Sequence, residues 1–362
     1  MIRWRYGTVT GIRGAWNGCT ELEVTVEARQ GEDSYQAKGL AYNDMVGIPQ
    51  VGDRLLLNCN ALSKGLGTGG YALVVAIPDR LPDDVDRPGH IVKARYTPLQ
   101  SMRLGVDEDD SPWREAVEAT RDLAGMPVIT ADLHSALAPI LAGIHFSRPT
   151  AKVAYIMTDG GSLPAWFSKA LDQLSDYLCG TITAGQCFGG QWEATNVHNG
   201  LIAAKAVADA DIAIVAQGPG NLGTGTIWGF SGTETGEAVN AASVLHGRPV
   251  ASLRISEGDA RERHWGISHH SMTSYGKVAL AGATVPVPRD IPAELQSKVR
   301  DQLAQLPDRH RQVEVSCDGL EEELKRLPVR LSTMGRGMDS DRIYFLAAAA
   351  AGRCAADMLA DD

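Results

Sequence analysis

The sequence predicts an α/β protein in which a mostly parallel, doubly wound sheet follows a small N-terminal antiparallel β-barrel domain. Within 21–29 apolar and polar residues alternate, with Leu22, Val24 and Val26 on one face, which is the period of a half-buried strand. After about residue 111, short segments that are apolar on both faces alternate with helical segments, a pattern typical of a parallel sheet covered by helices. We therefore expect the barrel over 1–78, a linker and the strands that lead onward over 79–110, and the doubly wound domain over 111–362.

Two domains also agree with the length, because 362 residues exceed what one hydrophobic core usually holds. In the first domain we expect strands near 5–12, 21–29, 35–42, 54–60 and 71–77. Short strands joined by tight turns favour a small barrel. The segment 79–89, DRLPDDVDRPG, is rich in proline and acidic residues, and we interpret it as the linker.

Strands and helices alternate in the second predicted domain. Helices are predicted over 111–123, 164–178, 197–208, 232–246 and 340–359. Strands are predicted over 128–130, 153–158, 181–184, 212–216, 250–255, 278–285, 313–317 and 329–332. The alanine-rich stretch 346–356 is expected to lie on the sheet, and packing in a homo-oligomer is the alternative.

Composition and charge argue against several classes of protein. The formal net charge of −10 disfavours nucleic acid and anionic membranes as partners, because phosphate binding needs clustered Lys and Arg. The apolar run 343–352 is too short to span a bilayer. Six cysteines without a C-x-x-C pair indicate neither a disulfide scaffold nor a zinc ribbon. We predict a cytoplasmic protein whose partner is a small anionic molecule.

Glycine-rich loops follow four of the predicted strands, at 158–162, 186–191, 217–226 and 333–337. In doubly wound sheets ligands bind beyond the carboxyl ends of the strands, and glycine lets main-chain N–H groups approach an anion closely. We therefore predict one shared anion site, although a tight turn is the favoured interpretation of any single loop. The residues expected to bind the anion are Gly160, Gly161, Gly218, Gly220, Asn221, Gly223 and Gly225, together with Arg254 and Arg336.

Each of these predictions has a simpler alternative. Arg254 and Arg336 could clamp a carboxylate or phosphate, or they could form ion pairs with carboxylates such as Asp259. Gly218, Gly220 and Gly223 match G-x-G-x-x-G, but the glycines and threonines that follow do not suit a helix. No G-x-x-x-x-G-K-[ST] motif occurs. NAD and a P-loop nucleotide are therefore not expected as cofactors.

Carboxylate and imidazole groups gather at the same predicted edge. Asp132 and His134 follow one strand and Asp159 follows another, and these three are our candidates for acid–base catalysis or for a divalent metal. Further such groups are Glu193, His198, Glu257, Asp259, His264, His269 and His270. Their spacing matches no strict metal signature, so caps and hydrogen-bonded loop histidines are the favoured interpretation of each residue alone.

Five segments carry a resemblance to a known family. They are GLGTGGYALVVA (65–76), TADLHSALAPI (130–140), TDGGSLPAW (158–166), GPGNLGTGT (218–226) and STMGRG with FLAAAAAG within 332–352. Together they resemble a bacterial family catalogued only as a domain of unknown function, over most of the chain. The resemblance implies a bacterial, cytoplasmic protein built as one unit, and it carries over no substrate or catalytic residue.

Three functions agree with these features. The favoured one is an enzyme, a transferase or hydrolase, that binds a small anionic or phosphorylated metabolite and uses Asp159 or His134 as acid or base. The second is a metal-dependent hydrolase that uses Asp132, His134 and Asp159. The third is a non-catalytic protein that senses a metabolite or serves as a scaffold.

Overall fold

The computed structural model describes residues 1–29, 31, 33–65 and 69–359. The chain divides into two compact units. One unit holds Met1–Pro88, Val92–Met102 and Trp166–Asp172, and the other holds Gly89–Ile91, Arg103–Ala165 and the chain from Gln173 onward. Within the described residues, no helix is both long and apolar enough to cross a membrane.

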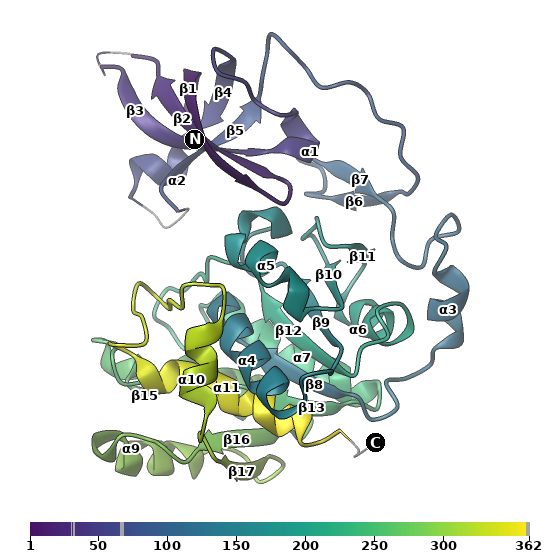
Figure 1. The fold of residues 1–362 in the computed structure, drawn as a ribbon, viewed down its shortest axis with the longest axis vertical. Coiled ribbons are helices and arrows are strands. Elements are labelled where there is room, and N and C mark those ends of the chain that lie inside the picture. The colour runs from purple at the N-terminus through teal and green to yellow at the C-terminus, as the bar shows by residue number, and fades with distance from the viewer. Residues whose placement is uncertain (30, 32, 66–68, 360–362) are drawn as a thin grey trace. The chain divides into compact units, whose positions relative to one another are not determined.

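The first unit contains the predicted barrel. Its strands are β1 (Trp4–Trp16), β2 (Cys19–Val26), β3 (Tyr35–Tyr42), β4 (Arg54–Asn58) and β5 (Tyr71–Ala76), and they close in the order β1-β2-β3-β5-β4 (Figure 1). All neighbours are antiparallel except β3 and β5, which run parallel. Two short helices, α1 (Asn43–Val46) and α2 (Asn60–Ser63), connect strands.

Alternation along β2 builds the inside of the barrel. Leu22, Val24 and Val26 are fully buried, while the intervening side chains face outward, as the period of two requires. The register of β1 against β2 shifts between Val9 and Gly11 and again after Ile12. Such irregularities bend a strand, which lets β1 pair with both β2 and β4 and close the barrel.

The second unit is built on an eight-stranded parallel sheet, as predicted. Its order is β11-β10-β9-β12-β8-β13-β16-β17, and every pairing is parallel. The strands are β8 (Pro127–Ala131), β9 (Val153–Thr158), β10 (Gly180–Ala184), β11 (Trp192–Ala194), β12 (Ile212–Gln217), β13 (Arg248–Ala251), β16 (Thr284–Pro288) and β17 (Arg311–Val315). A small two-stranded sheet of β14 (Ile255–Ser256) and β15 (Gly266–Ile267) accompanies it, whereas most residues of the two-stranded sheet β6 (Ile91–Lys93) and β7 (Ser101–Arg103) belong to the first unit.

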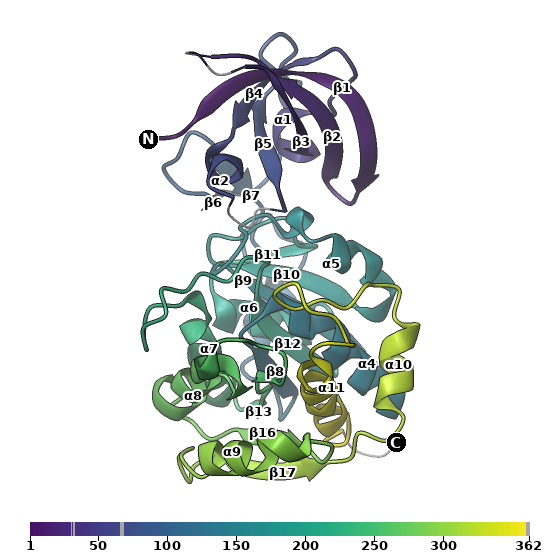
Figure 2. The ribbon, with the colours of Figure 1, turned by 90° about the vertical axis from the view of Figure 1, so that its left-hand side faces the viewer.

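Helices lie on both faces of this sheet. Figure 2 shows α4 (Leu137–Ser147) and α11 (Arg342–Ala356) on one side and α6 (Val197–Ala206) and α7 (Glu234–Val244) on the other. The remaining helices are α3 (Arg114–Ala119), α5 (Lys169–Gln173), α8 (His269–Thr273), α9 (Ala293–Leu303) and α10 (Leu320–Arg326). The doubly wound α/β class predicted for this part of the chain is confirmed.

The strand order creates a crossing point at the centre of the sheet. The chain passes from β8 to β9 and leaves a gap between them, and β12 later fills this gap. The carboxyl ends of β8, β9 and β12 therefore lie side by side. Ligands of doubly wound proteins bind at such points, beyond the carboxyl ends of the strands.

Several predicted elements are wrong in detail. The helix predicted over 164–178 is broken into the turn Ala165–Phe167, α5 and the turn Ser175–Tyr177. The carbonyl oxygen of Trp166 accepts hydrogen bonds from the Trp16 indole and the Cys19 thiol, so it is not available to a continuous helix. No strand forms over 329–332, where the chain bends and then continues without regular structure.

The strand predicted over 250–255 is also divided. It ends at Ala251, and the chain then leaves the sheet to form β14. The N–H of Arg254 donates to Ser271 Oγ at 3.0 Å instead of to a neighbouring strand. The predicted strand over 278–285 begins only at Thr284, because Ser274–Val278 form a π-helical turn.

Helices α4 and α11 pack unusually closely, and glycine makes this contact feasible. A Cβ atom on Gly143 of α4 would lie 1.9 Å from the carbonyl oxygen of Ala349, and one on Gly352 of α11 would lie 2.0 Å from that of Ile140. The alanine-rich helix thus packs on α4 and on the sheet, with Ala347–Ala351 buried. The backbones of the two helices approach as closely as their atoms allow.

The substitution Gly143→Ala tests this contact. Alanine is the better helix former by about 1 kcal/mol, yet the clash with Ala349 is expected to lower the free energy of unfolding by about 1–3 kcal/mol. Urea unfolding followed by circular dichroism measures the change. Gly276→Ala is the matched control, because the nearest atom to its added Cβ lies 4.0 Å away, and its midpoint should match that of the wild type. A Gly143→Ala midpoint at or above the wild-type value would contradict the close packing.

Candidate functional site

A side-chain amide joins the ends of the central strands. Gln217 is the last residue of β12, and its Nε2 donates to the carbonyl oxygen of Asp132 at 2.6 Å and to Asn221 Oδ1 at 2.8 Å. Asp132 directly follows β8 and is only 4% exposed. Burial raises the pKa of this carboxyl group, against the attraction of Arg254. The amide therefore fixes a buried carboxyl group at the crossing point of the sheet.

Buried polar atoms without a hydrogen-bond partner gather around this carboxyl group. Among the described residues they include Asp132 Oδ2, Gln217 Oε1, Arg254 Nε, His269 Nε2 and His270 Nδ1. Each such atom costs roughly 1–3 kcal/mol when it is left unsatisfied. Native structures keep few of them, so this concentration marks a candidate site for a ligand.

Three histidines stand next to Asp132. His264 lies in a short helical turn, and His269 and His270 begin α8. Their ring centroids are 4.4–4.9 Å apart, and one ligand atom from each lies within 4.8 Å of the others. His270 Nδ1 lies 3.9 Å from Asp132 Oδ2. Phe230 stacks on the His270 ring at 3.9 Å with an interplanar angle of 2°.

Burial keeps these imidazoles neutral. It lowers the pKa of His264 to about 3, and the positive charges of Arg254 and Arg261 contribute to the shift. Burial likewise lowers the pKa of His269 and of His270. Neutral imidazole offers a ring nitrogen as an acceptor or as a metal ligand. The sequence suggested a loop role for His264 alone, because the spacing between His264 and the pair His269 and His270 does not show that the three rings come together.

The two arginines expected at the site share one carboxylate. Arg254 Nη2 and Arg336 Nη2 lie 3.2 and 3.1 Å from Asp259 Oδ2, and Arg336 Nε lies 2.9 Å from Asp341 Oδ2. Burial opposes ionisation of Asp259, but hydrogen bonds and charges from Arg261 and Arg336 outweigh it and hold the pKa well below its usual range. Ion pairing, which the sequence offered as the alternative role of both arginines, thus accounts for these contacts. Arg254 Nε takes no part in them and is buried without a hydrogen-bond partner among the described residues.

A second carboxyl group, which sequence reasoning missed as a functional residue, lies at the end of β9. Thr158 Oγ1 donates a hydrogen bond to Glu234 Oε1. Burial raises the pKa of Glu234 to about 7, against the hydrogen bonds from Thr158 and from the backbone of Gly160. In the sequence, Ser231-Gly232-Thr233-Glu234 is a capping-box pattern, which indicates only the start of a helix. The position of Glu234 in the first helical turn after a glycine loop could have suggested a functional residue, but the sequence does not show that its carboxyl group is buried.

The glycine loops contact one another through their backbones. Ser162 N donates to the carbonyl oxygen of Pro219 at 2.7 Å. A Cβ on Gly161 would lie 2.1 Å from Gly218 O, and one on Gly160 would lie within 2.7 Å of Glu234 Oε1 and Gln217 Oε1. Close packing therefore explains these glycines.

Gly220 and Gly225 have a different role. They adopt φ angles of 97° and 84°, which favour glycine, and they lie in an exposed part of the loop. The fourth loop, which includes Gly335 with φ 81°, carries Arg336 to Asp259. Positive φ values at exposed glycines fit a loop that presents main-chain N–H groups.

The structure separates the three catalytic candidates of the sequence. His134 Nδ1 pairs with the Tyr155 hydroxyl at 2.9 Å, and burial lowers its pKa to about 4, only partly opposed by a hydrogen bond with the backbone of Gln217. Asp159 is exposed and accepts a hydrogen bond from Gln186 N at 2.7 Å. Asp132 alone faces the unsatisfied atoms. Across the described part of the chain, the one group of three or more such side chains with the spacing of a metal site is His264, His269 and His270.

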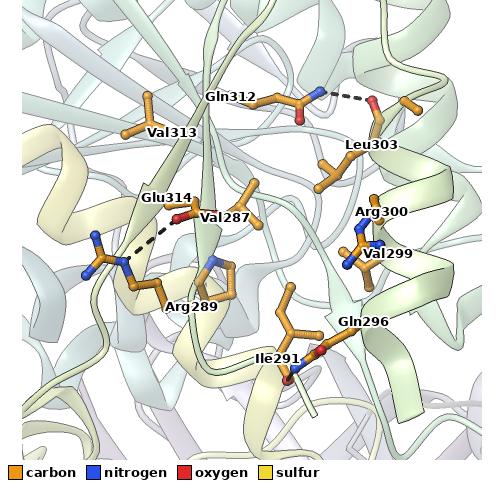
Figure 3. A pocket seen from close by; sticks show the side chains of 12 residues that line it. Val287, Arg289, Ile291, Gln296, Val299, Arg300, Leu303, Gln312, Val313 and Glu314 are labelled. Carbon is orange, nitrogen blue, oxygen red and sulfur yellow. Dashed lines mark hydrogen bonds and ion pairs between the residues drawn. The ribbon is translucent and has the colours of Figure 1, made fainter. Parts of the chain in front are cut away.

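Two surface pockets lie elsewhere and lack these features. Figure 3 shows a pocket of about 580 Å³ where β16 and β17 meet α9. Several of its polar side chains are engaged: Arg289 lies 4.0 Å from Glu314, Gln312 donates to Leu303 O at 2.9 Å, and Gln296 donates to Ile291 O at 3.2 Å. A groove of about 510 Å³ on the barrel is lined by Trp4, Arg5, Tyr6, Glu27, Ala28, Arg29 and Leu56. Neither pocket is lined by any of the five unsatisfied atoms around Asp132.

Comparison with known proteins agrees with the resemblance seen in the sequence. Residues 38–352 match the family described as "Protein of unknown function (DUF3866)". Because the match covers most of the chain, the protein belongs to this family. No curated protein and no solved structure matches the chain. The function must therefore be argued from the geometry of the site.

The raised pKa of Glu234 predicts a pH-dependent stability. The folded protein holds this proton up to about pH 7, the raised pKa of Glu234, whereas the unfolded chain releases it near the ordinary glutamate pKa of 4.5. The stabilisation is thus fully present below about pH 4.5, and it declines as the pH rises to 7, by up to roughly 3 kcal/mol. Glu234→Gln should remove this decline in urea unfolding measured from pH 4.5 to 8.

The control for this experiment is Glu294→Gln in the first turn of α9. Glu294 is exposed and is not among the charges that raise the pKa of Glu234, so this variant should keep the wild-type pH dependence. An unchanged pH profile in Glu234→Gln would show that Glu234 ionises normally and is not buried as described.

Proposed function

We propose that this member of the family is an enzyme that acts on a small anionic metabolite, with the reacting group held beside Asp132 and with Glu234 as the proton-transferring residue. The observation that carries the proposal is the group of five unsatisfied buried polar atoms at the crossing point of the sheet. The proposal includes a bacterial, cytoplasmic setting, which the sequence predicts.

Donors for an anion come from both sides of the proposed site. Arg254 is 2% exposed and its Nε has no partner among the described residues. The guanidinium group of Arg263 lies near the long glycine loop, with Nη2 3.6 Å from the position of a Cβ on Gly225. Guanidinium groups and main-chain N–H groups are the donors that bind carboxylate and phosphate in proteins. These donors support an anionic substrate although the chain as a whole is acidic.

Proton transfer is assigned to Glu234 because its pKa of about 7 lies near neutral pH, where a general acid or base works best. Thr158 and the backbone of Gly160 fix the carboxyl group. His134 is less suited, since burial keeps it neutral and Tyr155 occupies Nδ1. Asp159 lies at the same edge and raises the pKa of Glu234 further by its charge.

Ligand-dependent stabilisation tests the anion site. Thermal unfolding of the full chain is measured with inorganic phosphate, phosphorylated metabolites and dicarboxylates, and a ligand at 100 times its Kd should add about 2.7 kcal/mol of stability. Arg254→Lys keeps the charge but removes the Nε donor, so it should weaken binding at least tenfold. Arg261→Lys is the control, because the Nε and Nη2 atoms of Arg261 already contact Asp259, at 2.9 and 2.8 Å.

A catalytic role and a sensing role differ in what Glu234→Gln does. For an enzyme, the variant should bind the ligand as the wild type does and lose turnover at least 100-fold, since general acid–base catalysis contributes about 10²–10⁴-fold. A protein that only senses the metabolite would show binding without turnover in both forms. Equal stabilisation of Arg254→Lys and the wild type by every anion would contradict the proposed site.

A further inference from the structure

We propose that His264, His269 and His270 bind one divalent transition-metal ion, with Asp132 as a fourth ligand. This inference deepens the proposed function and rests on it for what the ion does, because the ion would hold the anionic group of the substrate. Binding of the ion itself is a separate property of these four side chains.

The candidate ligand atoms of Asp132 and the three histidines lie close enough together to coordinate one ion after small side-chain movements. His270 Nδ1 and Asp132 Oδ2 are 3.9 Å apart, too far for a hydrogen bond. Metal–ligand distances of roughly 2.0–2.2 Å allow up to about 4.2 Å between two ligands of one ion. The nitrogens of the three histidines, now within 4.8 Å of one another, would approach to roughly 3.4 Å around a tetrahedral ion. Small rotations of the side chains supply this change.

The two best-placed ligand atoms are buried and unsatisfied. Asp132 and His270 are both 4% exposed, and neither Oδ2 nor Nδ1 has a hydrogen-bond partner among the described residues. His269 Nε2 is likewise buried and unsatisfied. Other buried histidines do not share this state: both ring nitrogens of His310 are engaged, with Ala283 N at 3.1 Å and Tyr275 O at 2.8 Å. Among the described histidines, the buried and unsatisfied ring nitrogens therefore belong to this cluster.

Neighbouring residues hold the imidazoles in place, as the surroundings of metal sites do. Ser268 Oγ lies 2.7 Å from His264 Nδ1 and accepts a hydrogen bond from His270 N at 3.2 Å. A donor role for His264 Nδ1 in this contact leaves its Nε2 for the ion. The backbone before Ser268 is itself clamped, because Gln302 of α9 bonds both the N–H and the C=O of Ile267, at 2.8 and 2.7 Å.

The donor set selects the class of metal. Three neutral imidazoles and one carboxylate suit zinc, cobalt, nickel or iron in the divalent state rather than magnesium or calcium. Such a site would carry a net charge of about +1 and would attract an anion as a further ligand. Arg254 lies beside α8, because its main-chain N–H donates to Ser271 Oγ at 3.0 Å, and its unsatisfied Nε would face the same anion. The ion would act as a Lewis acid toward that group.

Metal titration of the full chain tests the inference. Protein treated with chelator and then dialysed is titrated with Zn²⁺ alone in calorimetry and with Co²⁺ alone in absorption spectroscopy. We expect one ion per chain, and a Co²⁺ spectrum of nitrogen and oxygen ligation without a thiolate charge-transfer band. His269→Gln should weaken Zn²⁺ binding at least about 100-fold, and Asp132→Asn should weaken it at least about tenfold. His246→Gln is the control, because this exposed histidine pairs only with Asp122 and should leave the affinity unchanged.

Three outcomes would overturn the proposed metal site. Absence of stoichiometric Zn²⁺ binding, equal affinity in His269→Gln and the wild type, or a thiolate band in the Co²⁺ spectrum would do so. If His269→Gln does not fold, the Co²⁺ spectrum of the wild type and the affinity of Asp132→Asn decide the matter. Anion-dependent stabilisation that persists in chelated protein and depends on Arg254 would uphold the proposed function while the metal site fails. Metal binding without any anion-dependent stabilisation would uphold the metal site and contradict the proposed anion-binding function.

Discussion

The hydrogen bond from Gln217 to the carbonyl oxygen of Asp132 is the contact on which the rest of the site depends. β12 enters the sheet between β8 and β9, which precede it in the chain, and the amide joins the end of β12 to the end of β8 through a hydrogen bond of 2.6 Å. Beyond that bond, one loop leads to Asn221 and the exposed glycines, and the other leads to His134. Without this contact, Asp132 would not be presented to the histidines of α8.

The candidate site lowers the stability of the second unit, and apolar packing elsewhere in the same unit offsets this loss. Five buried polar atoms lack partners around Asp132, at a cost of roughly 1–3 kcal/mol each. On the face of the sheet that α4 and α11 cover, the contact between these two helices is almost wholly apolar, with Ile140, Ala349 and Ala350 fully buried. Stability is thus concentrated in the helical layer, and unsatisfied groups are concentrated at one edge of the sheet.

The sequence predicted local features well and long-range ones poorly. β9 matches its predicted range, Val153–Thr158, because an apolar run bounded by a glycine loop is a local signal. α4 was missed because its residues are apolar on all sides, so it has no amphipathic period to detect. The pairing of Asp132 with His270 and the burial of Glu234 depend on contacts between distant segments. For that reason the sequence indicated the sheet edge at which the candidate site is proposed but not the contacts between its residues.

Charge decides what kind of ligand this edge can accept. Arg254, Arg261 and Arg336 surround Asp259, while Asp341 contacts only Arg336 among them, so this network carries one positive charge in excess. The adjacent histidines are neutral because burial lowers their pKa. An anion alone would satisfy Arg254 Nε but would leave the acceptor atoms of Asp132, His269 and His270 without donors. A cation alone would engage those acceptors and leave Arg254 Nε unsatisfied, so the proposed metal ion and the proposed anion complement each other at these four side chains.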